Sequence, residues 1–287
     1  MRTAARTLFA TRRGLTLVAR SAAVFFGGVG AAVQLYWAFG LSFHVSGLVV
    51  LAVMAVGALA WGVVRPWPRQ VIGRNLRRPD VTVEVRVGDL FDQGAHLVVG
   101  YTDTFDTELG DDEVISPASV QGQFQRRIYD DDLQRLDQDL RAALVDQPVL
   151  ATERPEDKRG GKLDRYPMGT VAVLGQPARR YFCVAYSRMG NNLVAKSTIS
   201  FLWESLDSLW DAVYARGKRG AVAIPIIGSE LARVHSLDRE NLLKMIILSF
   251  VARSREESIC ERLIVVIHPK DAARINMLEV EAFLRAV

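Results

Sequence analysis

Two short loops in this sequence carry residue types that bind polar small molecules. One is GYTDTFDT, residues 100–107, which follows the apolar run HLVV. The other is IIGSELAR, residues 226–233, which follows AVAIP. Hydroxyl and carboxylate groups form hydrogen bonds, and the backbone N–H groups of Gly228 and Ser229 could bind an anion as glycine-rich turns bind phosphates. An aspartate in such a loop equally serves to cap a turn, so each loop alone leaves both interpretations open.

The segments around these loops predict an α/β domain. VTVEVRV alternates as a strand should, and HLVVG and AVAIP are short apolar runs typical of a sheet covered on both faces. TVAVLG, RYFCVAYS and RLIVVIH also read as strands, and helices are expected at about 121–145, 193–216, 237–253 and 270–286. This alternation predicts three layers around a largely parallel or mixed sheet, with ligands bound beyond the carboxyl ends of its strands. The charged segment 152–169 is predicted to be a surface loop.

The N-terminal part of the chain has a different composition. From Ser21 to Val64, 44 consecutive residues contain no Asp, Glu, Lys or Arg, and one helix needs about 20 apolar residues to cross a bilayer. We therefore expect a transmembrane hairpin over 21–64, with helices at about 21–41 and 45–64 and a turn in AFGLSFHV. A basic N-terminus (1–20) and a basic connector (65–79) flank it, which predicts that both termini are cytoplasmic. A cleaved signal peptide and a buried hairpin of a soluble protein are the alternatives.

Charge and cysteine content exclude two classes of protein. The chain has 36 basic and 32 acidic residues, and ten of the basic ones are arginines within residues 1–78, which contain no acidic residue. The remaining 26 basic residues against 32 acidic ones give the rest a net charge of −6, so nucleic acid is not expected as a partner. Two cysteines do not form a disulfide framework, and we expect free thiols. No metal site and no cofactor are expected.

The motifs beside both loops resemble those of a macro domain, the α/β/α module that binds ADP-ribose. Gly-Asp-Leu at 88–90 corresponds to its Gly-Asp-Ile element, and Pro-Ile-Ile-Gly at 225–228 to part of its late Pro-x-x-Gly-x-Gly loop. The resemblance covers residues 80–287. GYTDTFDT stands where the usual domain has Asn-Ala-Ala-Asn, and Glu230 replaces the second glycine of the late loop. These departures, SVQGQF at 119–124 and the preceding hairpin are most similar to the macro-domain effector of Thoeris anti-phage defence.

This resemblance implies a ligand-sensing effector of the bacterial inner membrane that is not an enzyme. In such systems a partner TIR-domain enzyme makes an ADP-ribose-derived signal from NAD, such as histidine–ADP-ribose. Binding of this signal would then cause oligomerisation and disruption of the membrane lipid. Asp89 would accept a hydrogen bond from the adenine amino group, Phe105 would form a wall beside the distal ribose, and Asp103 and Asp106 would contact an amino-bearing adduct.

The late loop would donate backbone hydrogen bonds to the diphosphate, and Arg233 would add positive charge there. The expected ligand-binding residues are Asp89, Leu90, Gly100, Tyr101, Thr102, Asp103, Thr104, Phe105, Asp106, Thr107, Ser119, Gly122, Ile227, Gly228, Ser229, Glu230, Leu231 and Arg233.

Two other functions remain open on the sequence. Some macro domains remove ADP-ribose from proteins, so a membrane-anchored ADP-ribosyl hydrolase is the main alternative. The sequence lacks the asparagines of the usual loop, and its four histidines and two cysteines show no catalytic spacing, so it offers little support for a hydrolase. The third function is a passive membrane-anchored scaffold with an unused pocket.

Overall fold

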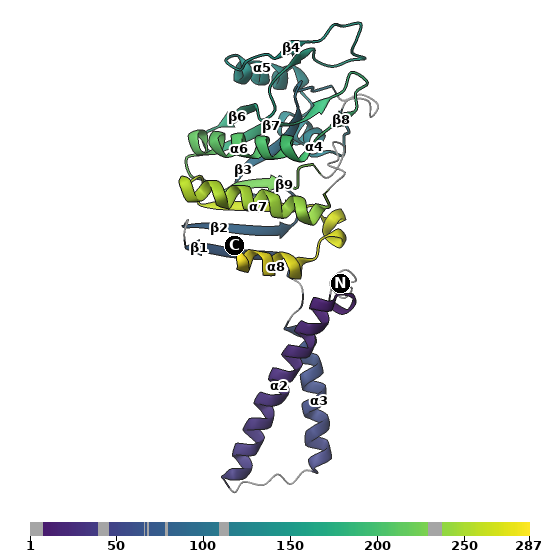
Figure 1. Ribbon diagram of the computed structural model, residues 1–287, viewed down its shortest axis with the longest axis vertical. Coiled ribbons are helices and arrows are strands. Elements are labelled where there is room, and N and C mark those ends of the chain that lie inside the picture. The colour runs from purple at the N-terminus through teal and green to yellow at the C-terminus, as the bar shows by residue number, and fades with distance from the viewer. Residues whose placement is uncertain are drawn as a thin grey trace. The chain divides into compact units, whose positions relative to one another are not determined.

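The computed structural model describes residues 8–39, 46–65, 67, 69–77, 80–108, 115–228 and 237–287. The chain divides into two compact units, each described by itself below (Figure 1). The first consists of residues 1–70 with 276–282 and is mainly a helical hairpin. The second consists of residues 71–275 with 283–287 and is an α/β domain.

The hairpin is made of α2 (Arg12–Ala38) and α3 (Gly47–Val64). Both helices are long and apolar enough to cross a membrane. α2 begins where the Thr11 hydroxyl accepts a hydrogen bond from the backbone N–H of Gly14, nine residues before the start that we expected from the sequence. The expected turn in AFGLSFHV falls largely on residues 40–45, which lie outside the described residues.

Small residues let the two helices approach each other. A side chain at Gly57 would meet the ring of Phe25, and one at Gly62 would meet Ala22. Elsewhere the apolar side chains of both helices are largely exposed within this unit: none of the apolar stretch of α2 is buried, and 11% of that of α3 is buried. Such exposure is unlike the core of a soluble protein, in which apolar side chains are buried.

The α/β domain is built on one mixed sheet with the strand order β1-β2-β10-β9-β3-β7-β6. The five central strands from β2 to β7 run parallel, whereas β1 and β6 pair antiparallel at the two edges, and the short β8 pairs with the end of β7. The strand bounds are β1 Val71–Arg77, β2 Asp80–Val87, β3 His96–Thr102, β6 Val171–Gln176, β7 Arg179–Met189, β8 Ala195–Lys196, β9 Val222–Pro225 and β10 Arg262–Ile267; β4 (Ala151–Thr152) and β5 (Asp164–Arg165) form a separate ribbon.

Helices cover the sheet and complete the predicted three layers (Figure 1). The pair α4 and α5 packs against β3 and β6, and the pair α6 and α7 packs together with α6 on β6 and β7. On the first face Leu97, Val99 and Tyr101 of β3 form a core with Phe124 and Leu136, where each buried side chain contributes about 1.5–3 kcal/mol. The helix bounds are α4 Val120–Tyr129, α5 Leu133–Leu144, α6 Ile199–Arg216, α7 Arg239–Glu256, the 3-10 helix η1 Pro269–Arg274 and α8 Met277–Ala286.

Four expected elements differ from the structure. The single helix expected over 121–145 is interrupted because Asp130 and Asp131 have φ angles of 52° and 61°, and Asp132 then caps α5. The helix expected from 193 begins at Ile199, after β8, and the last expected helix is divided into η1 and α8. Residues expected to form the connector contain β1, so the sheet begins at Val71 instead of position 80.

Both cysteines are free, as the sequence predicts, and both are buried. Burial raises the pKa of the Cys260 thiol to about 12. The thiol is therefore protonated at neutral pH, and a protonated thiol is a poor nucleophile.

Candidate functional site

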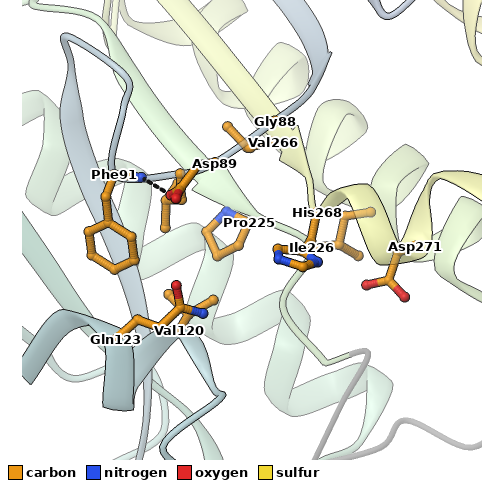
Figure 2. A pocket seen from close by; sticks show the side chains of 11 residues that line it. Gly88, Asp89, Phe91, Val120, Gln123, Pro225, Ile226, Val266, His268 and Asp271 are labelled. Atoms are coloured by element: carbon orange, nitrogen blue, oxygen red, sulfur yellow. Dashed lines mark hydrogen bonds between the residues drawn. The ribbon is translucent and has the colours of Figure 1, made fainter. Parts of the chain in front are cut away.

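A cleft lies at the carboxyl ends of β2, β9 and β10, beside the first turn of α4 (Figure 2). This is the edge of a parallel sheet at which α/β proteins bind ligands. Its lining residues are Gly88, Asp89, Leu90, Phe91, Val120, Gln123, Pro225, Ile226, Val266, His268 and Asp271.

Asp89 is one of two aspartates, with Asp271, among the described lining residues of this cleft, and it lies in the turn that follows β2. The turn is fixed because the backbone N–H of Gly88 donates to the carbonyl of Ile267 at 3.0 Å. One carboxylate oxygen of Asp89 accepts from the backbone N–H of Phe91 at 2.8 Å (Figure 2). The other lies 2.5 Å from Nη1 of Arg127 on α4, and 38% of each of these two charged side chains is exposed.

The electrostatic balance keeps Asp89 ionised. Partial burial raises the pKa of its carboxyl, but the hydrogen bonds from Arg127 and from the Phe91 backbone outweigh burial, and the pKa is lowered overall. The Arg127 guanidinium also lies 4.7 Å from the centre of the Phe91 ring, a cation–π contact. Carboxylate, guanidinium and aromatic ring thus form one polar rim at the cleft.

The floor of the cleft is mainly apolar, with Leu90, Pro225, Ile226 and Val266. An apolar floor beside an ionised carboxylate suits a flat ring that carries an amino group. The cleft has about 60 Å³ of free volume in this structure, which is room for roughly two water molecules.

The loop after β3 has a different environment. Asp103 is buried, and its carboxylate accepts from Nη1 of Arg165 at 2.7 Å and from the backbone N–H of Met189 at 2.8 Å. Asp106 is also buried, with Nζ of Lys158 at 3.3 Å from each of its oxygens. The Thr104 hydroxyl donates a hydrogen bond to the same carboxylate. Both loop aspartates are therefore bonded to cations of the protein itself.

Phe105 and its neighbours are buried with these carboxylates. The Phe105 ring stacks on Tyr101 with centres 5.5 Å apart and meets the edge of Tyr166 at 5.6 Å. Its φ of 49° is unusual for a residue with a side chain. The Thr107 hydroxyl donates to Asp137 at 2.7 Å. These side chains hold the loop against α5 and the following segments.

Residues 153–166, which we call the strap, cover this loop. Lys158 and Arg165 of the strap are buried, and the backbone N–H of Tyr166 donates to the Asp103 carbonyl at 2.8 Å. Nζ of Lys162 donates to the Phe105 carbonyl at 2.8 Å. The prediction that 152–169 is a surface loop was therefore wrong for two of its cations, Lys158 and Arg165, which are buried and pair with Asp106 and Asp103.

The structure brings together only some of the expected ligand-binding residues. Asp89 and Leu90 line the cleft, and Ile227 and Gly228 directly follow its lining residue Ile226. Gly228 has a φ of 81°, a conformation that favours glycine.

The other expected residues lie elsewhere or outside the described part. Ser119 is the N-cap of α4, and a side chain at Gly122 would come 2.6 Å from the carbonyl oxygen of Ser116. Gly100, Tyr101, Thr102, Asp103, Thr104, Phe105, Asp106 and Thr107 form the end of β3 and the loop that the strap covers. Ser229, Glu230, Leu231 and Arg233 lie outside the described residues, and the ligand-binding role of this whole set stays a prediction.

Sequence reasoning missed several residues of the cleft, among them Phe91, Gln123, His268 and Asp271, and it also missed Arg127 at its rim. His268 caps η1, because its Nδ1 accepts from the backbone N–H of Lys270 at 3.3 Å. Its position at the end of the predicted strand RLIVVIH was the available signal for a place at the carboxyl edge of the sheet.

Comparisons with known proteins agree with the α/β fold described above. The family model of the macro domain of the Thoeris protein ThsA matches residues 83–268. Two variants of the macrodomain of Oceanobacillus iheyensis have TM-scores of 0.50 to this chain, at 12% and 13% identity. The first match covers 76% of this chain and 100% of the macrodomain, and the second covers 75% and 94%. At this identity the likeness shows the fold alone. No curated protein matches the chain.

Proposed function

Since the chain belongs to the family of the macro domain of the Thoeris protein ThsA, we propose that it is a membrane-anchored sensor of an ADP-ribose-derived signal in anti-phage defence. A partner TIR-domain enzyme would make this signal, with histidine–ADP-ribose as one candidate. The observation that carries the proposal is the ionised Asp89 carboxylate beside an apolar floor, at the ligand-binding edge of the sheet.

The chemistry of the cleft suits an adenosine. The Asp89 carboxylate would accept a hydrogen bond from the adenine amino group, and Pro225, Ile226 and Val266 would contact the ring. Hydrogen bonds to charged groups contribute roughly 1.5–3 kcal/mol. The diphosphate would then lie toward Gly228, where a chain with positive φ can present backbone N–H groups.

We expect ligand binding to move side chains at the cleft, because its enclosed volume of about 60 Å³ is small for a purine. Gln123 is one candidate, because it projects into the cleft from the first turn of α4 (Figure 2). Arg127 is a second, because an adenine bonded to Asp89 would compete with its guanidinium for the carboxylate. Affinity is then reduced by the cost of this rearrangement.

Signal output would pass from this domain to the hairpin. A ligand shifts an equilibrium only by binding one arrangement more tightly than the other. In the proposed function the liganded arrangement favours a homo-oligomer whose helices α2 and α3 disrupt the bacterial inner membrane. The apolar exposure of both helices supports contact with lipid.

The test is calorimetric titration of the full chain in non-ionic detergent with ADP-ribose, histidine–ADP-ribose and NAD. We expect selective binding of one ligand and at least tenfold weaker binding by Asp89→Ala, from the loss of one hydrogen bond to a charged acceptor. Asp92→Ala is the matched control, because Asp92 also bonds Arg127 but does not line the cleft. Failure of all three ligands to bind would contradict the proposal.

Two further measurements separate the alternatives. The bound signal should release a dye from liposomes that contain the full chain, and Asp89→Ala should suppress this release. Liberation of free ADP-ribose from a modified protein would instead favour the hydrolase.

A further inference from the structure

A second hollow opens beside the end of β7 and shares no lining residue with the Asp89 cleft. Its volume is about 310 Å³, roughly ten times the share of one liquid water molecule. Most of its lining is polar. The residues are Glu153, Arg165, Arg188, Met189, Gly190, Asn191, Asn192, Val194 and Lys196.

Two cations stand opposite each other at its wall. Arg188 on β7 and Lys196 on β8 are direct partners in the antiparallel register, and side chains so placed have Cβ atoms about 4.5–5.5 Å apart. Like charges at such positions repel each other. Within the described part of the chain neither residue forms an ion pair, and both are exposed. An anion between them would remove the repulsion.

Buried Arg165 supplies a third, rigid cation. Only 6% of its side chain is exposed, and it donates to Asp103 at 2.7 Å, to Glu153 at 2.5 Å and to Asn191 at 2.9 Å. These bonds use three of the five N–H groups of a guanidinium. Its position is therefore fixed before any ligand arrives.

Among the residues that the structure describes, Glu153 is the one carboxylate that lines this hollow, and it is already engaged. Glu153 accepts from Arg165 and, at 3.3 Å, from the side-chain amide of Asn191. These two hydrogen bonds and the nearby charge of Arg188 lower the pKa of Glu153, although its burial acts in the opposite direction. Asp103 also bonds Arg165, so three cations stand against two carboxylates, and one positive charge remains in excess at Arg188 and Lys196.

A tight turn fixes the rim of the hollow between β7 and β8. The backbone N–H of Gly190 donates to the Val194 carbonyl at 3.0 Å, and the N–H of Leu193 donates back to Gly190 at 2.9 Å. A side chain at Gly190 would come 2.5 Å from Oδ1 of Asn192. The Asn192 amide, held by this turn, is an additional neutral donor at the rim.

We propose that this hollow binds an oxyanion, the phosphate or carboxylate group of a small molecule, between Arg188 and Lys196. Arginine binds both groups through paired N–H donors, and lysine adds a point charge. The volume admits more than one such group. The anion has two chemical sources, a free phosphate compound or the anionic end of the molecule that occupies the Asp89 cleft. The site itself does not rest on the proposed function.

Pyrophosphate is the probe, titrated into the full chain in non-ionic detergent by calorimetry and by thermal unfolding. The double variant Arg188→Gln/Lys196→Gln should bind it at least tenfold more weakly than the wild type. Arg255→Gln, which removes an exposed cation from α7, should change binding less than twofold. Without pyrophosphate the double variant should unfold at the same or a higher temperature, because the repulsion is gone. Equal binding by wild type and double variant, or none by the wild type, would overturn the proposal.

Two further binding measurements distinguish this site from the Asp89 cleft. Asp89→Ala should leave pyrophosphate binding unchanged, and a loss of binding in that variant would contradict a separate site. If the double variant also weakens ADP-ribose binding tenfold, the anion belongs to the signal; if it does not, the source is a free anion. Failure of ADP-ribose to bind while pyrophosphate binds would defeat the proposed function and leave this site standing.

Discussion

The three aspartates that we expected at the ligand site fall into two groups. Asp89 bonds Arg127 at the rim of the cleft with 38% of its side chain exposed. Asp103 and Asp106, after the neighbouring part of the sheet, have side chains that are 4% and 1% exposed beneath the strap. All three have a cationic partner. The difference in burial leaves the first accessible from solvent, whereas the other two hold the loop in place.

The same difference sets their energetic roles. An exposed ion pair contributes about 0–1 kcal/mol to stability, because water solvates both charges and salt screens them. Removing one partner of a buried pair costs about 3–5 kcal/mol, because the other charge stays buried without compensation. Substitutions beneath the strap should therefore act on stability, and those at Asp89 on binding.

The largest loss of stability is expected for the substitution Asp106→Ala. It leaves the Lys158 ammonium, which has no exposed area, without its carboxylate, and should lower the free energy of unfolding by about 3–5 kcal/mol. Thermal unfolding of the full chain in detergent measures this. The double variant Asp106→Leu/Lys158→Met should be more stable than either single variant. If the effects of the two substitutions simply add, the pair is not coupled as the structure indicates.

A smaller loss of stability is expected for the substitution Gly161→Ala in the strap. Gly161 has a φ of 76°, and a Cβ there would lie 2.3 Å from Oδ1 of Asp106. The left-handed backbone alone costs a residue with a side chain about 1–2 kcal/mol, and the clash adds to it. Gly94→Ala is the control, because nothing lies within 4 Å of a Cβ at that position. Equal unfolding temperatures for the two variants would show that the strap can rearrange to accept the extra methyl group without a loss of stability.

Substitution of Asp89 should have little effect on folding. Asp89→Asn keeps the size of the side chain and removes an exposed ion pair, so the free energy of unfolding should change by about 1 kcal/mol or less. Binding of the proposed signal should fall in the same variant. A loss of stability as large as that of Asp106→Ala would remove the distinction between the two regions.

The smallest effect is the pH dependence of the Asp89 contribution. Although burial raises its pKa, the bonds from Arg127 and Phe91 lower it overall, below the unfolded value of about 3.9. The pair therefore stabilises the fold above about pH 4, and this contribution is lost as the pH falls through the folded pKa. The stability difference between wild type and Asp89→Asn should disappear below that range. A difference that persists at pH 2 would show that the charge of Asp89 is not its cause.

The fold and part of the cleft could be predicted from the sequence because their signals are local. The alternation of apolar strands and helices predicted three layers, and Gly-Asp-Leu at 88–90 supported the macro-domain resemblance, which the family match confirms. This resemblance placed Asp89 and Leu90 at the ligand site, and both line the cleft. Periodicity also predicted α6 and α7, but not the break at Asp130, where two aspartates adopt positive φ.

The strap could not be predicted, because its partners are distant in the sequence. Lys158 is 52 residues from Asp106, and Arg165 is 62 residues from Asp103. A charged segment rich in glycine is typical of a solvated loop, and nothing in its composition shows that two cations are buried. The pairing of Asp89 with Arg127 across 38 residues was missed for the same reason.

The antiparallel pairing of β1 with β2 has a mechanical consequence. Val71, the first residue of β1, is paired with Arg86, which lies three positions before Asp89. β1 therefore begins at the same end of the sheet as the cleft. Within the α/β domain, the first residue of β1 is thus held in register with the strand that positions the Asp89 turn.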